Sequence, residues 1–155
     1  MRIIIIVLVN SLIGCATGYH ASSSSGGFQQ TRLGVGVYQV RFQGNGLTDH
    51  DLVSTYLLRR CAELTLENGS RYFEVGEMAH QTTTAVTGSQ YMVMSVNIPR
   101  GETVMRILPP GKTGLDAITV VRETNEAADG VLSEAARATL GRIVREDSVN
   151  DGPLN

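Results

Sequence analysis

Few residues in this chain have the types and spacing that catalysis needs. The run Gly111-Lys112-Thr113 matches only the last residues of a phosphate-binding loop. That loop needs a glycine five residues before Gly111, where Arg106 stands, and a helix after it, where the pattern predicts a strand. The pair Gly34 and Gly36 lies inside a predicted strand and forms no dinucleotide-binding fingerprint. We therefore expect no nucleotide cofactor.

The histidines and carboxylates predict no catalytic or metal site either. His50 stands between Asp49 and Asp51 at the start of a predicted helix, where a solvated capping turn explains the cluster better than a metal or acid–base site. Glu74 and Glu77 are three residues apart in a predicted strand, which places them on opposite faces. The sequence predicts no catalytic residue, no metal ion and no cofactor.

The two cysteines, Cys15 and Cys61, have different predicted roles. Cys61 lies among apolar residues in a predicted helix, which favours a small buried side chain over the alternative of a redox or catalytic thiol. Cys15 follows a short positive and apolar segment, and its sulfur is a nucleophile that could accept a lipid. We therefore do not expect a disulfide between the two.

The first 15 residues, MRIIIIVLVNSLIGC, have the pattern of a secretion signal. Their apolar run is too short to cross a bilayer, which needs about 20 residues. The ending Leu12-Ile13-Gly14-Cys15 resembles the bacterial lipobox. The resemblance implies diacylation of the Cys15 sulfur, cleavage before Cys15 and acylation of the new amino terminus. Residues 1–14 are thus expected to be a lipoprotein signal peptide, the alternative being an ordinary amino-terminal strand.

The residues after Cys15 predict how the protein is held and where. Residues 15–32 are rich in Ser and Gly, so a flexible lipidated tether is expected there. The residue after Cys15 is Ala16 and not Asp. By resemblance to enterobacterial sorting, this favours the periplasmic side of the cell outer membrane over the inner membrane. The predicted contact with the membrane is the lipid anchor at Cys15.

Composition limits the class of protein. The 155 residues are enough for one domain of ordinary size. The 13 Lys and Arg residues against 15 Asp and Glu residues give a net charge of −2, which argues against a nucleic-acid partner. A hydrophobic fraction of 42% argues against a disordered chain.

The mature chain is predicted to be a single small α+β domain over residues 33–147, followed by a disordered tail over 148–155. Alternating apolar residues predict about five strands, and helical spacing predicts two helices. In the first helix, Arg59 and Glu63 are expected to pair on the solvent-facing side. The expected strands are 33–43, 71–75, 90–98, 102–108 and 117–122, the expected helices are 49–67 and 127–145, and 79–89 is expected to be a mobile loop. Residues 90–98 and 102–108 should form a hairpin that turns at Pro99-Arg100-Gly101.

A family resemblance runs from Gly18-Tyr19 through Gly26-Gly27-Phe28 and Arg32-Leu33 to Tyr72-Phe73. It is specific in two stretches. They are Tyr38-x-Val40-x-Phe42-x-Gly44-Asn45-Gly46 and Leu57-Leu58-x-Arg60-Cys61-Ala62-Glu63-Leu64-Thr65-Leu66. Over about the first half of the mature chain, the sequence resembles a family of small, uncharacterised proteobacterial lipoproteins. The resemblance implies the lipid-anchored location and no particular chemistry, because that family has no assigned activity.

One polar set is left as a candidate interaction patch: Asn45, Arg60 and Glu63. The alternative is that these residues solvate an exposed helix face. We expect a non-enzymatic envelope lipoprotein that binds an envelope protein or peptidoglycan, through residues 79–89 and 49–67. The alternatives are a periplasmic hydrolase or metal-dependent enzyme, and a soluble intracellular protein.

Overall fold

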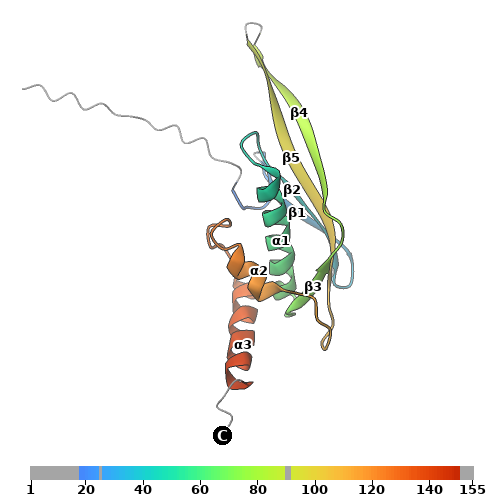
Figure 1. The fold of residues 1–155 in the computed structure, drawn as a ribbon, viewed down its shortest axis with the longest axis vertical. Coiled ribbons are helices and arrows are strands. Elements are labelled where there is room, and N and C mark those ends of the chain that lie inside the picture. Colours follow the sequence, from blue (N-terminus) through green and yellow to red (C-terminus); the bar gives the residue numbers. More distant parts are fainter. Residues whose placement is uncertain (1–17, 25, 90–91, 151–155) are drawn as a thin grey trace, which may run out of the picture.

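The computed structural model describes residues 18–24, 26–89 and 92–150, which form one mixed α+β domain (Figure 1). The predicted fold class is therefore confirmed. The strands are β1 (Gly27–Gly34), β2 (Val37–Gln43), β3 (Tyr72–Val75), β4 (Ala79–Ser89), β5 (Met92–Ile107) and β6 (Leu115–Asp116), and the helices are α1 (His50–Glu67), α2 (Ala117–Glu123) and α3 (Glu134–Asn150). The six strands form one antiparallel sheet in the order β1-β2-β5-β3-β6, with β4 also paired to β5.

The sheet is covered by helices on one face only. Tyr38, Val40 and Phe42 of β2 point to that face and are buried, as their alternation predicted. Helix α1 packs there. Because β2 and β3 are each antiparallel to β5, they are parallel to each other with β5 between them. The strand–helix–strand unit predicted around α1 therefore encloses a third strand.

Helix α1 begins and ends where the sequence predicted. Asp49 is the N-cap, and its Oδ1 accepts a hydrogen bond from Leu52 N at 2.7 Å. The helix ends at Glu67, and Gly69 has a positive φ of 75° that few other residues adopt. In the described part of the chain, no helix combines the length and apolar character that crossing a membrane requires.

The flexible tether predicted over residues 15–32 is wrong at Tyr19 and from Gly27 onward, while residues 15–17 and 25 lie outside the described residues. Tyr19 is 8% exposed, and β1 begins at Gly27. The aromatic rings of Tyr19 and Phe28 lie 5.0 Å apart, centroid to centroid. Two aromatic side chains can bury enough apolar surface to order a Ser- and Gly-rich segment that its average composition marks as flexible.

The hairpin predicted around residues 99–101 is also wrong, because β5 runs through them without a turn. Its partner is β4, which occupies the predicted mobile loop 79–89. Gly101 does not serve a turn: a Cβ atom there would lie 2.7 Å from side-chain atoms of both Leu57 and Val53 in α1. Glycine at this position lets the helix approach the sheet closely.

The carboxyl-terminal third is more helical than predicted. Residues 117–122, expected to be a strand, lie in helix α2, which is capped by Asp116 and buries Ile118, Val120 and Val121. Helix α3 begins at Glu134, whereas the prediction began at residue 127, and Val131 is 57% exposed. Residues 148–150 of the predicted tail are still helical, and residues 151–155 lie outside the described residues. β-branched residues favour strands in the abstract, but burial against α1 decides the outcome here.

Candidate functional site

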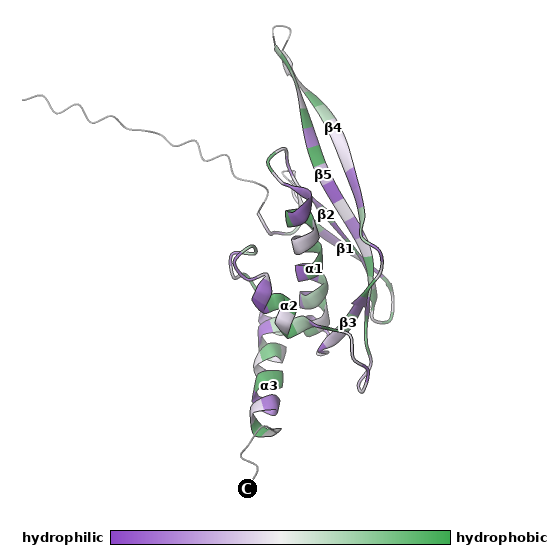
Figure 2. Cartoon of the chain, in the orientation of Figure 1, coloured by the Kyte–Doolittle hydropathy of each residue, from purple (hydrophilic) through white to green (hydrophobic). Residues whose placement is uncertain are grey.

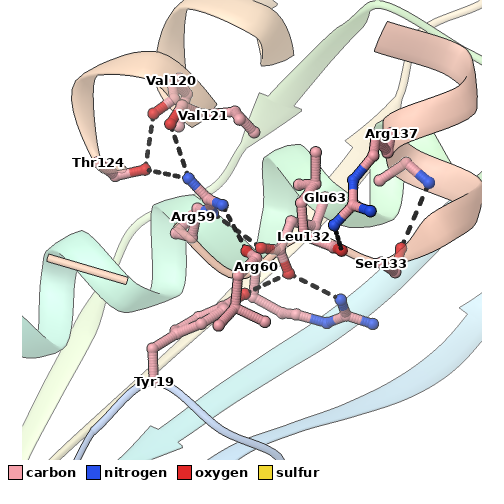
Figure 3. Close-up of polar contacts among 12 residues, drawn as sticks. Tyr19, Arg59, Arg60, Glu63, Val120, Val121, Thr124, Leu132, Ser133 and Arg137 are labelled. Carbon is pink, nitrogen blue, oxygen red and sulfur yellow. Dashed lines mark hydrogen bonds and ion pairs between the residues drawn. The ribbon is translucent and has the colours of Figure 1, made fainter. Parts of the chain in front are cut away.

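A network of buried charged residues lies at the centre of the molecule, where α1 meets α2 and β1 (Figure 3). It also includes Tyr19, which belongs to the described residues before β1, here called the amino-terminal segment. Arg59 is 0% exposed, and the side chain of Glu63 is 4% exposed. The two residues form the predicted i,i+4 ion pair, but the prediction that this pair faces solvent is wrong. The sheet covers one side of α1, while α2 and α3 cover another, so the helix has little free surface.

Arg59 connects α1 to the residues that precede α3. Its Nε donates to Glu63 Oε1 at 2.8 Å, and its Nη1 donates to the carbonyl oxygen of Val121 at 2.7 Å. Its Nη2 donates to the carbonyl oxygen of Val131 at 2.6 Å. A buried guanidinium is tolerated when its donors are bonded and its charge is balanced. Glu63, four residues away, balances the charge of Arg59, and the carbonyl acceptors lie more than 60 residues away in sequence.

Arg60 connects the same helix to β1. Its Nη1 donates to Glu63 Oε2 and to Glu67 Oε1, both at 2.9 Å. Its guanidinium carbon lies 4.7 Å from the ring centroid of Phe28, a cation–π contact. Burial alone would lower the pKa of Arg60, but the hydrogen bond and negative charge of Glu67 outweigh it and raise the pKa. Arg60 therefore stays charged.

Tyr19 brings the amino-terminal segment into this network. Its hydroxyl donates to Glu63 Oε2 at 2.5 Å, and its ring lies 5.4 Å from that of Tyr56. Burial, followed by the negative charge of Glu63, strongly raises the pKa of Tyr19, so its hydroxyl keeps its proton. In the described residues, every buried side-chain nitrogen or oxygen has a hydrogen-bond partner. The network therefore holds these segments together. We call the hydrogen bond from Tyr19 to Glu63 the clamp.

The three residues of the predicted patch, Asn45, Arg60 and Glu63, do not lie together in the structure. Arg60 and Glu63 are in direct contact, but they are buried. Asn45 lies in the loop before α1, where its Oδ1 accepts from Leu47 N at 2.9 Å. Arg60 is ten residues beyond the first residue of α1, or about 15 Å along the helix axis. Asn45 therefore shapes the loop, and the network it was grouped with lies elsewhere.

Sequence reasoning missed Tyr19 and Glu67 as members of the network, and it placed Arg59 at the surface. One signal for Arg59 was available: α1 carries apolar residues on nearly all its faces around this position, including Leu58, Cys61, Ala62 and Leu64. A helix with this pattern is covered on more than one side. Cys61 is a free, buried thiol, and burial raises its pKa to about 12, which fits the small apolar role predicted for it. Cys15 lies outside the described residues.

Two histidines that are distant in sequence meet at the surface. The rings of His50 and His80 lie 5.7 Å apart, and His50 Nε2 lies 3.2 Å from the hydroxyl of Thr82. The sequence predicted a capping turn for Asp49, His50 and Asp51, and Asp49 does cap α1. Within the described ranges, no cluster of three or more His, Cys, Asp or Glu side chains could hold a metal ion.

The open face of the sheet carries a shallow hollow of about 340 Å³. Two rows of paired residues cross its floor. In one row, Arg41 forms an ion pair with Glu102 at 2.8 Å. In the other row, Arg100 lies between Gln43 and Gln81. In the described part of the chain, Arg100 has no carboxylate within ion-pair distance, so the hollow presents an uncompensated positive charge among amide groups.

Comparisons with protein-family models, with curated proteins and with solved structures found no match to this chain. The family resemblance that the sequence suggests stays a prediction.

Proposed function

We propose that this chain is a lipid-anchored protein of the bacterial cell envelope whose domain binds a partner and catalyses no reaction. The observation that carries the proposal is Leu12-Ile13-Gly14-Cys15 directly after a short apolar segment. Acyl chains on Cys15 would hold the protein, since each buried methylene contributes about 0.8 kcal/mol and stable anchoring needs more than one chain. Because Ala16 follows Cys15, the proposed location is the periplasmic side of the outer membrane.

The buried position of Tyr19 supports this arrangement and refines it. Tyr19 follows Cys15 by only four residues, and four residues span at most about 14 Å. The clamp between Tyr19 and Glu63 would therefore keep this side of the domain close to the lipid headgroups. The proposed anchor is a short, fixed attachment, which limits how the domain can turn on the membrane.

The distribution of polar groups favours binding over catalysis. The most deeply buried charges are committed to each other in the network on α1. Accessible polar groups gather in the hollow on the open sheet face, where Arg100 and the amides of Gln43 and Gln81 could bind a carboxylate or peptide group. Peptidoglycan and envelope proteins both offer such groups, and we propose one of them as the partner.

The anchor is tested by mass spectrometry of protein purified from its own membranes. The expected mature chain begins at Cys15 and carries the mass of its acyl groups, and the protein fractionates with the outer membrane. Cys15→Ser should move the protein out of the membrane fraction or leave it uncleaved. A native chain that keeps Met1 and carries no acyl mass would contradict the proposal.

The binding surface is tested by cosedimentation with purified peptidoglycan and by crosslinking in intact envelopes. Arg100→Ala should reduce retention or crosslinking at least several-fold. The matched control is Arg122→Ala, which removes an exposed arginine from α2, away from the open sheet face. If both variants behave like the unmodified protein, or if neither wall material nor any protein is captured, the proposed binding role is wrong.

A further inference from the structure

The paired strands β4 and β5 extend well beyond the rest of the sheet. The pairing of β2 with β5 ends at Gln43 and Arg100, whereas β4 and β5 stay paired as far as Ser89 and Met92. We call this extension the arm, defined as residues 82–89 and 92–99. Figure 1 shows it projecting past the amino-terminal end of α1. The hydrophobic core contains no residue of the arm.

The arm has no charged side chain. The sequence from Gln81 to Pro99 contains no Asp, Glu, Lys or Arg. Several apolar side chains are exposed instead: Val86 (70%), Met92 (65%), Val93 (74%) and Met94 (56%). In Figure 2 green, apolar segments of β5 also appear in this part of the molecule, which no helix covers. Exposed apolar residues gathered on a projection indicate a surface that binds something.

Strand β4 also presents an open edge. In the described residues its only strand partner is β5, so alternate residues direct their backbone N–H and C=O groups away from the sheet. The edge runs over Ala79–Ser89, about 37 Å at the rise of an antiparallel strand. Edge strands are normally protected by lysine, proline or bulges. The sequence of β4, AHQTTTAVTGS, contains no lysine or proline and is rich in threonine, which favours strands.

We propose that β4 pairs with β4 of a second copy of this chain, antiparallel, around a two-fold axis. In such a dimer the same edge contributes from both copies, so a charge near the two-fold axis would meet its like. An uncharged edge avoids this repulsion. With full overlap Thr84 lies opposite Thr84 of the second copy, and His80 lies opposite Gly88, which keeps the two histidines at opposite ends. The two sheets would join through a central β5-β4-β4-β5 layer.

The unpaired backbone groups of the arm favour a protein strand, and not the lipid bilayer, as its binding partner. A two-stranded arm inserted into hydrocarbon would leave the outward N–H and C=O groups of its edges without hydrogen bonds, which is strongly unfavourable. Pairing with another strand satisfies those groups along β4. A second copy supplies a strand of matching length and equal lack of charge. The inference needs only this edge and holds whether or not Cys15 is lipidated.

The first test measures the dimer by analytical ultracentrifugation of the full chain, both as isolated from membranes and as the Cys15→Ser form. The unmodified chain should dimerise. Thr84→Lys and Thr84→Glu should each raise the dimer dissociation constant at least tenfold, and an equimolar mixture of the two should restore a heterodimer. The matched control is Thr31→Lys, the same exchange at an exposed position of another edge strand, β1. An unmodified chain that stays monomeric, or a Thr84→Lys variant that dimerises normally, overturns the proposal.

A second test measures how close the two copies of β4 lie at the two-fold axis. Thr84→Cys is labelled with pyrene in the Cys15→Ser background, where Cys61 is buried and so protected from the label. Two pyrenes that face each other across the axis should give excimer emission, and unlabelled protein added in excess should abolish it. Pyrene that stays monomeric but changes its emission on mixing with phosphatidylethanolamine–phosphatidylglycerol vesicles would show that the arm meets the membrane, and the proposal would be wrong.

Discussion

Glu63 is the residue on which the buried network depends. It accepts hydrogen bonds from Tyr19, Arg59 and Arg60, so one carboxylate balances groups from α1 and from the amino-terminal segment. Removing it would leave the fully buried guanidinium of Arg59 without its counter-charge. Hydrogen bonds and opposite charges offset the desolvation of these buried groups. Removing one partner should therefore destabilise the fold far more than removing one partner of a surface ion pair.

We expect Glu63→Ala to lower the free energy of unfolding by about 3–5 kcal/mol, the range measured when one partner of a buried ion pair is removed. The control is Glu146→Ala. It breaks the ion pair of Arg142 with Glu146, which has the same i,i+4 spacing but lies at the surface. That change should cost about 0.5 kcal/mol or less. Urea denaturation followed by circular dichroism compares the two, and equal losses would contradict the role of Glu63.

We also expect stability to fall as the pH rises from about 9 to 12. Burial raises the pKa of Cys61 from 9.0 to about 12 and raises that of Tyr19 above its usual 10.0. Over this range the folded chain keeps both protons while the unfolded chain releases them, so each unit of pH favours the unfolded state. Tyr19→Phe and Cys61→Ala should each flatten the decline, whatever their stability at neutral pH. Unfolding midpoints measured at several pH values provide the check, and unchanged slopes would contradict the assignment.

At the scale of elements, the fold depends on how closely α1 lies on β5. The contact passes over Gly101, where a Cβ atom would lie 2.7 Å from atoms of Leu57 and Val53. Both of these side chains are fully buried, so they have little room to move. The absence of a side chain at Gly101 is thus a condition for α1 to reach the sheet, and with it for the network to close on the other side of the helix.

We therefore expect Gly101→Ala to destabilise the domain by about 1–3 kcal/mol, the usual cost of overpacking a core. Gly34→Ala is the matched control: it makes the same exchange at a strand position where the added Cβ meets nothing within 4 Å. Thermal unfolding of the two variants separates packing from any general effect of replacing glycine in a strand. A Gly101→Ala variant as stable as the control would mean that α1 can shift at little cost.

At the scale of the whole molecule, the chain consists of a packed body and a projecting arm. The body buries the core between the sheet and its helices, whereas the arm contributes no residue to that core and exposes Val86, Met92, Val93 and Met94. The residues that stabilise the fold therefore lie in the body, and the residues proposed to pair with a second copy lie in the arm. The clamp at Tyr19 belongs to the body, so the proposed membrane attachment and the proposed dimer edge can be altered independently.

This separation predicts that the arm can be shortened without unfolding the body. Replacing residues 84–97 by Asn-Gly would join Thr83 to its pairing partner Ile98 through a two-residue hairpin turn. The shortened chain should keep its thermal unfolding midpoint within a few degrees, because no core residue is removed. It should also be monomeric by ultracentrifugation. A collapse of the body on shortening would show that the arm contributes to folding.

The sequence by itself determined the features that depend on neighbours along the chain. Helix α1 could be placed because Asp49 and Gly69 end it by local hydrogen bonding and backbone conformation. The inward face of β2 followed from simple alternation. The same reasoning failed for Ile118, Val120 and Val121, whose β-branched side chains predicted a strand but lie in α2.

Only the tertiary structure decided what covers each element on its remaining sides. Arg59 and Glu63 look like an ordinary surface pair along the sequence, and they are buried because α2 and the residues before α3 close over them. Tyr19 lies in a segment of flexible composition, and it is held by a carboxylate 44 residues away. Local patterns report how one segment prefers to fold, whereas burial depends on contacts between segments that are distant in sequence. The network and the arm therefore could not be predicted from the sequence alone.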